Sequence, residues 1–201
     1  MEISPVFAQT YQHYLEQINQ IEFLSKAEML GLERDGDTLK IPLYDKIYTF
    51  STEGLREKNE NDIAPAVQVM ICKYILTRSA GAPVIEDKLV TYREFKDSGP
   101  LTSYFTTNTN KILETTFSGN LPLLKEKSFL IGGELLSSDM YDLSLRYYAF
   151  PKISVIVNFN DSDDLFHAKC SILYRSVAAH YLDMESLAMT GTLLTGKLIT
   201  S

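Results

Sequence analysis

The spacing of apolar residues changes along this chain, and that change limits its fold more than any other sequence feature. After the hairpin signal Asp35-Gly36, Leu39, Ile41 and Leu43 alternate with polar residues or proline. Alternation of this kind is typical of a strand with one buried face. We predict an antiparallel meander of three strands, at residues 29–34, 37–43 and 46–51, followed by a polar loop at 52–61.

Helical spacing governs other segments. Apolar residues recur at three- and four-residue intervals from Ile63 to Ile75, with Pro65 in the first turn, which predicts a broadly buried helix from Asp62 to about Arg78. Ser79 to Pro83 would end this helix. Further helices are predicted at 5–23, 101–117 and 120–131, and a last one begins after the capping residue Asp183.

A second strand-like region follows in the last third of the chain. Tyr147 to Phe159 is rich in β-branched and aromatic residues, with Pro151 between two strands, and Lys169 to Arg175 is a further strand or buried segment. We therefore predict an α+β fold, with the meander, a short β region near 146–175 and several packed helices. Since no repeat or linker interrupts residues 1–201, we expect a single domain whose core covers about 28–200.

The charge balance excludes some classes of function. The 201 residues contain 19 Lys and Arg against 26 Asp and Glu, a net charge of 19 − 26 = −7. Nucleic acid and anionic lipid require a basic surface, and the longest apolar runs are far shorter than the roughly 20 residues of a membrane span. We therefore expect neither nucleic acid nor a membrane as a partner. Because no basic leader followed by an apolar core is evident, we also expect a cytoplasmic protein.

The number of cysteines, two, limits which kinds of metal site this chain can form. Cys72 and Cys170 lie in apolar stretches and cannot supply the four ligands of a structural zinc or a usual iron–sulfur cluster. We expect buried reduced thiols, with a disulfide as the alternative. His167, Cys170 and His180 have the spacing of no established metal site, so we expect no metal and no cofactor.

Arg93-Glu94 lies in an irregular segment, 84–100, of the type that often has a functional role. Two interpretations stay open. Arg93 can pair with an acidic neighbour while Glu94 accepts hydrogen bonds from loop amides, or the two side chains can form the polar wall of a ligand cleft.

The acidic turn at residues 161–164 raises the question of a calcium site, because hard cations bind clustered oxygens. The EF-hand register fails: counted from Asn158, position six is Asp163 instead of Gly and position twelve is Lys169 instead of Glu. A solvated turn or a weak cation site remains. Gly132-Gly133 fits no phosphate-binding motif and predicts the end of a helix, with phosphate binding as the remote alternative.

A set of landmarks follows in order along the chain: Asp35-Gly36, Tyr74-Ile75-Leu76, Tyr92-Arg93-Glu94-Phe95, Ile131-Gly132-Gly133, Asp139, Phe150-Pro151, Asp161 to Asp164, Tyr181-Leu182 and Glu185-Ser186-Leu187-Ala188. Their order, over most of residues 28–200, resembles an uncharacterised prokaryotic family of unknown function from anaerobes. Some members are fused to a four-cysteine iron–sulfur module like that of the corrinoid iron–sulfur protein, so the resemblance implies an anaerobic one-carbon or redox setting. This chain lacks the module, has Phe159 where relatives are expected to have Trp, and has Arg175 where they often have Asp.

Three functional hypotheses follow. The first is an accessory module that binds a partner protein or small ligand in anaerobic cofactor or redox metabolism. The second is an enzyme with an acidic cleft acting on a small metabolite, and the third is a metal- or corrinoid-binding protein. No residue is assigned a catalytic role, and the oligomeric state stays open. The candidate ligand-binding residues are Arg93, Glu94, Gly132, Gly133, Asp139, Asp163 and Asp164.

Overall fold

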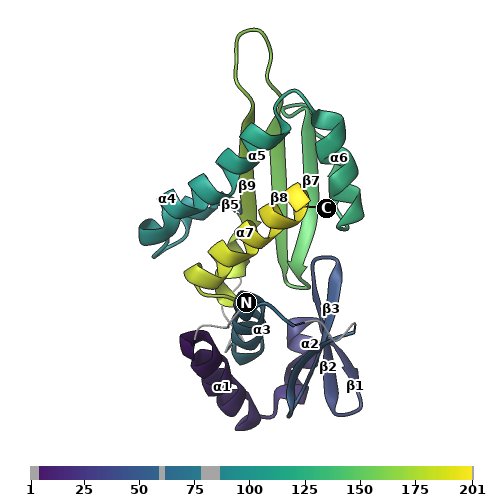
Figure 1. The fold of residues 1–201 in the computed structure, drawn as a ribbon, viewed down its shortest axis with the longest axis vertical. Coiled ribbons are helices and arrows are strands. Elements are labelled where there is room, and N and C mark those ends of the chain that lie inside the picture. The colour runs from purple at the N-terminus through teal and green to yellow at the C-terminus, as the bar shows by residue number, and fades with distance from the viewer. Residues whose placement is uncertain (1–4, 59–61, 78–86, 201) are drawn as a thin grey trace.

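Two antiparallel sheets organise the chain, and helices lie over one face of the larger sheet (Figure 1). The computed structural model describes residues 5–58, 62–77 and 87–200. The α+β fold and the N-terminal antiparallel meander are therefore confirmed.

The smaller sheet has four strands in sequence order. They are β1 (Glu33–Asp35), β2 (Thr38–Leu43), β3 (Lys46–Ser51) and β4 (Gly54–Glu57). As predicted, Leu39, Ile41 and Leu43 are buried on one face of β2.

Two boundaries of the predicted meander were wrong. The first strand begins at Glu33, because Ala27–Leu30 forms a helical turn, α2, which ends at Gly31 in the left-handed conformation (φ 69°). The predicted loop at 52–61 contains β4, a polar edge strand that pairs with β3 through its backbone. Its register does not depend on an apolar pattern, so the sequence gives little sign of it.

Two helices and a short 3-10 turn lie beside the smaller sheet. Helix α1 (Pro5–Asn19) packs against α3 (Pro65–Leu76), and η1 (Phe23–Lys26) follows α1. The predicted first helix, 5–23, thus ends four residues early. Ala64, not Asp62, is the N-cap residue of α3. Arg78 lies outside the described residues, and so does the segment predicted to end this helix, Ser79 to Pro83.

The larger sheet has the strand order β5-β9-β8-β7-β6. The predicted β region near 146–175 forms its centre, but β5 and β6 come from outside that region. Each has three residues, which is too short for an alternating pattern to be recognised. The strands are β5 (Leu89–Thr91), β6 (Glu134–Leu136), β7 (Leu143–Phe150), β8 (Ile153–Asn160) and β9 (Lys169–Arg175).

Helices from the second half of the chain cover this sheet (Figure 1). The predicted helix 101–117 is broken at Thr109, whose φ of −129° and ψ of −84° interrupt the helical path. Asp183 caps the last helix as predicted, since its Oδ1 accepts a hydrogen bond from the backbone N–H of Ser186 at 2.8 Å. The elements are η2 (Tyr92–Glu94), α4 (Gly99–Asn108), α5 (Asn110–Phe117), α6 (Leu121–Leu130), η3 (Ser176–His180) and α7 (Met184–Thr200).

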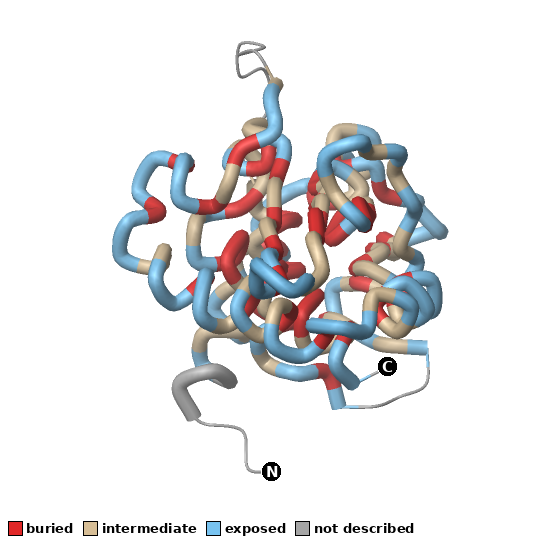
Figure 2. Tube along the Cα trace, turned by 90° about the horizontal axis from the view of Figure 1, so that it is seen from above, coloured by how far each residue is buried: buried red, intermediate tan, exposed pale blue. Residues whose placement is uncertain are grey.

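Buried residues gather at the centre of the molecule, inside a rim of exposed residues (Figure 2). Tyr44 ties the two sheets together: its backbone N–H lies 3.2 Å from the carbonyl oxygens of Tyr148 and Ala149 in β7. Its hydroxyl donates a hydrogen bond of 2.8 Å to the carbonyl oxygen of Thr190 in α7. The smaller sheet is therefore hydrogen-bonded both to the larger sheet and to helix α7, which covers that sheet.

Within the described ranges, no helix combines the length and the apolar character that crossing a membrane requires.

Candidate functional site

A pocket of about 410 Å³ lies where η2, α4, α5 and β9 meet. It contains two of the predicted ligand-binding residues, Arg93 and Glu94, and joins segments that are up to 81 residues apart in sequence. Its lining consists of Thr91, Tyr92, Arg93, Glu94, Thr102, Phe105, Thr106, Asn110 and Ile172.

Glu94 both closes its own turn and faces this pocket. Its Oε2 accepts hydrogen bonds from the backbone N–H of Thr91 at 2.7 Å and from the Thr91 hydroxyl at 2.8 Å. These two hydrogen bonds hold the pKa of the Glu94 carboxyl below its ordinary value. The pocket therefore contains a carboxylate that is ionised at neutral pH and has unused acceptor positions.

Arg93 is exposed at the pocket, and its lack of an ion pair with any described residue distinguishes it from three other arginines of the chain. Arg56, Arg146 and Arg175 are paired with Glu53, Glu134 and Asp87, respectively. Among the described residues, by contrast, the Arg93 guanidinium has no ion-pair partner. The expected pairing of Arg93 with an acidic neighbour is thus not formed with any described residue, which leaves its donors available to a ligand.

The floor of the pocket is apolar. The rings of Tyr92 and Phe105 stack with centroids 4.5 Å apart and an interplanar angle of 12°, and Ile172 of β9 completes the floor. The Tyr92 hydroxyl donates to the carbonyl oxygen of Met184 at 2.7 Å, which fixes the ring against the start of α7.

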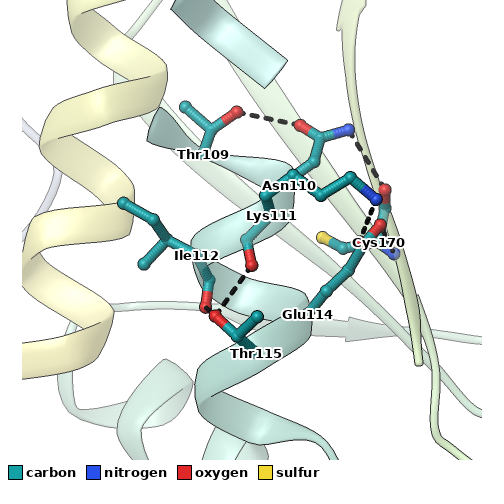
Figure 3. A network of polar contacts seen from close by, with 7 residues as sticks. All are labelled: Thr109, Asn110, Lys111, Ile112, Glu114, Thr115 and Cys170. Atoms are coloured by element: carbon teal, nitrogen blue, oxygen red, sulfur yellow. Dashed lines mark hydrogen bonds and ion pairs between the residues drawn. The ribbon is translucent and has the colours of Figure 1, made fainter. Parts of the chain in front are cut away.

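A polar stripe on α4 and α5 forms the opposite wall. Asn110 is held at both ends of its amide: Nδ2 donates to the carbonyl oxygen of Cys170 at 3.1 Å, and Oδ1 accepts from the Thr109 hydroxyl at 2.8 Å (Figure 3). Glu114 accepts the backbone N–H of Cys170 at 3.1 Å. The sequence analysis did not predict this wall, although its lining residues Thr102, Thr106 and Asn110 recur at intervals of four, which is a recognisable polar pattern.

The predicted glycine pair lies elsewhere and ends α6. Gly132 has a φ of 80°, in the left-handed region, and its N–H donates to the carbonyl oxygen of Phe129 at 3.2 Å. The N–H of Gly133 donates to the carbonyl oxygen of Ser128 at 2.8 Å. The pair forms the predicted helix end, and it does not line the pocket at Arg93.

The predicted aspartates are also separated from Arg93. Asp139 lies in the connection between β6 and β7, and Asp163 and Asp164 lie in the loop between β8 and β9, all three exposed. A single cleft lined by Arg93, Glu94 and these aspartates is therefore not formed. Strand order explains this result for Asp139, because β5 and β6 are the two edges of the sheet. Asp163 and Asp164 precede β9, whereas β5 pairs with the C-terminal end of that strand, from Leu173 to Arg175.

A family model described as "Domain of unknown function (DUF3786)" matches residues 22–197. The chain belongs to the DUF3786 family. The match covers both sheets, α7 up to residue 197 and the whole pocket at Arg93. The resemblance to a family of unknown function is therefore confirmed at this level. No curated protein and no solved structure matches the chain.

The thiols of this DUF3786 chain are free and buried. Burial raises the pKa of the Cys72 thiol to about 12 and also raises that of Cys170, so both stay protonated and unreactive at neutral pH. The alternative of a disulfide is therefore wrong. In the described part of the chain, no three or more His, Cys, Asp or Glu side chains are grouped to hold a metal ion.

A second polar pocket, also of about 410 Å³, surrounds Lys73 and was not predicted. Lys73 Nζ lies 2.7 Å from Asp183 and 3.6 Å from Glu185, and His180 lines the same pocket. Because two carboxylates already surround this ammonium group, it is a weaker anion site than Arg93. The pocket at Arg93 is thus the better candidate in this DUF3786 domain.

Proposed function

We propose that this DUF3786 chain is a binding module that holds a small anionic metabolite in the pocket between η2, α4 and β9. The observation that carries the proposal is Arg93: an exposed guanidinium at the edge of a preformed pocket, with no ion-pair partner among the described residues. A guanidinium binds a carboxylate or phosphate through two parallel hydrogen bonds, which makes it the side chain best suited to such a ligand.

The remaining walls fit the same class of ligand. A volume of about 410 Å³ lies in the range of small-molecule sites, roughly 300–1,000 Å³. Glu94 can accept a hydrogen bond from a ligand amine or hydroxyl, and the stacked rings of Tyr92 and Phe105 can contact its apolar part. A ligand with an anionic group, a hydrogen-bond donor and a short apolar body would use all three.

We place this activity in the cytoplasm of an anaerobe, as an accessory step of cofactor or redox metabolism. The resemblance to a family of anaerobes, some of whose members have an iron–sulfur module, supports the metabolic setting. Two buried free thiols, Cys72 and Cys170, fit a reducing compartment.

Native mass spectrometry of the protein purified anaerobically from its source tests the proposal. We expect the wild type to retain a small adduct, and Arg93→Gln to lower its occupancy about tenfold or more, since a charge-assisted pair is lost. Lys96→Gln is the matched control. Lys96 lies three residues after Arg93 and does not line the pocket, so this variant removes one positive charge without changing the pocket wall. An adduct that survives Arg93→Gln, or a wild type without one, would contradict the proposal.

A further inference from the structure

The loop between β8 and β9 presents two large apolar side chains to solvent. Leu165 is 83% exposed and Phe166 is 70% exposed. Figure 1 shows that this hairpin projects beyond the helices, at the end of the larger sheet away from the smaller sheet. Exposed apolar residues are common singly, but adjacent ones at the end of a projecting hairpin indicate an interaction surface.

Hydrogen bonds to two aspartate side chains close this loop and fix its base. Asp163 Oδ1 accepts the backbone N–H groups of Leu165 and Phe166 at 2.8 and 2.7 Å, and its own N–H donates to the carbonyl oxygen of Phe166 at 3.0 Å. At the base of the loop, Asp161 Oδ1 accepts the N–H of Gly119 at 2.6 Å. A partner therefore meets a preorganised loop and does not need to order it, which favours binding.

Carboxylates lie in the same loop as the two apolar side chains and at its base. Asp161, Asp163 and Asp164 lie in the loop itself. The N–H of Asp161 donates to Asp142 Oδ2 at 2.8 Å, which places a fourth aspartate at the base of the hairpin. These four aspartates are a concentrated part of the negative charge of a chain whose net charge is −7.

We propose that Leu165 and Phe166 dock into an apolar socket on a partner protein, and that Lys and Arg side chains border this socket. The apolar pair would supply the buried centre of the interface, and the aspartates would pair with the basic border. An anionic membrane would repel the same aspartates. A second copy of this chain would bring a further net charge of −7 to the contact.

Site-specific photo-crosslinking in the source organism tests this docking. The photoreactive residue p-benzoylphenylalanine would replace Phe166 and, in a control, Ile47, which is 59% exposed on β3 of the smaller sheet. We expect position 166, but not position 47, to crosslink to one other protein, which mass spectrometry then identifies.

The purified partner is then titrated with variants of the full chain. We expect Leu165→Ser with Phe166→Ser to weaken binding at least about tenfold, because the apolar anchors are lost. Ile47→Ser should leave the affinity unchanged. Asp164→Asn should weaken binding less, and mainly at low salt, because the basic border of the socket loses one charge partner. All of these side chains are exposed, so unchanged melting temperatures would show that the fold is intact.

Several results would overturn the proposal. They are no crosslink at position 166, a crosslink only to a second copy of the chain, and equal affinity of the wild type and the double variant. Binding of the wild type, but not the double variant, to phosphatidylglycerol vesicles would instead assign the loop to a membrane surface.

Discussion

The side-chain amide of Asn110 donates a hydrogen bond of 3.1 Å to the carbonyl oxygen of Cys170. Strand β5 pairs with β9 only from Leu173 to Arg175, so the N-terminal part of β9 has no neighbouring strand on that side. Helix α5 takes that place, because Glu114 also accepts the N–H of Cys170. Two side chains one helical turn apart thus satisfy both backbone groups of one edge residue, beside the candidate pocket.

Removal of the Glu114 acceptor should destabilise this edge. We expect Glu114→Leu to lower the free energy of unfolding by about 1–2 kcal/mol, since the Cys170 N–H would lose its partner in a partly buried place. Glu114→Gln keeps an oxygen acceptor and should lower it less. Urea denaturation compares the two variants, and equal losses would show that the hydrogen bond to Cys170 is not the cause.

Much of the fold follows from local patterns, and the pocket does not. The alternation of Leu39, Ile41 and Leu43 is a property of one segment, and the structure confirms the strand. The three-residue strands β5 and β6 have no such pattern, since their pairing is decided by neighbours distant in sequence. In the same way, Arg93 and Glu94 could be proposed as a polar wall from their segment alone. Their approach to Asn110 depends on how α5 packs against β9.

The glycine pair after α6 should tolerate a methyl group very differently at its two positions. A Cβ on Gly133 would lie 2.7 Å from Cε1 of the buried Tyr147 and 2.8 Å from the carbonyl oxygen of Ser128. We expect Gly133→Ala to cost about 2–3 kcal/mol of stability through overpacking. Gly132→Ala meets no atom within 4 Å and only strains a φ of 80°, at a cost of about 1–2 kcal/mol.

Urea denaturation of both glycine variants distinguishes these effects. If Gly132→Ala lowered stability more than Gly133→Ala, the close packing of Tyr147 would not be the reason for glycine at position 133. Normal stability of both variants with loss of a bound anion would instead support the alternative of a phosphate site at the pair.

The junction between the two sheets can be weakened through Tyr44. Its hydroxyl donates to the Thr190 carbonyl oxygen at 2.8 Å, so Tyr44→Phe should lower the free energy of unfolding by about 1 kcal/mol. Tyr48→Phe is the matched control, because the Tyr48 hydroxyl has no hydrogen bond to another described residue. Equal melting temperatures for the two variants would contradict a role of the Tyr44 hydroxyl at the junction.

Asp183 links the cap of α7 to α3 and should make stability depend on pH. Its Oδ1 accepts the N–H of Ser186 at 2.8 Å, and its Oδ2 lies 2.7 Å from Lys73 Nζ. Burial raises the pKa of the Asp183 carboxyl, but the hydrogen bonds from Lys73 and Ser186 outweigh burial and hold the pKa below its ordinary value.

Because the pKa of Asp183 is lower in the folded state than in the unfolded chain, its ionised form stabilises the fold. That contribution is complete above the unfolded pKa of about 3.8 and is lost as the pH falls through the lower folded value. We expect Asp183→Asn, which keeps the capping oxygen, to cost about 1 kcal/mol at about pH 7, a modest value because the side chain is half exposed. The difference from the wild type should shrink at about pH 3. Urea midpoints at the two pH values measure it, with Glu185→Gln, 3.6 Å from Lys73, as a control of smaller effect. A difference that is equally large in acid would mean that the charge of Asp183 does not stabilise the fold.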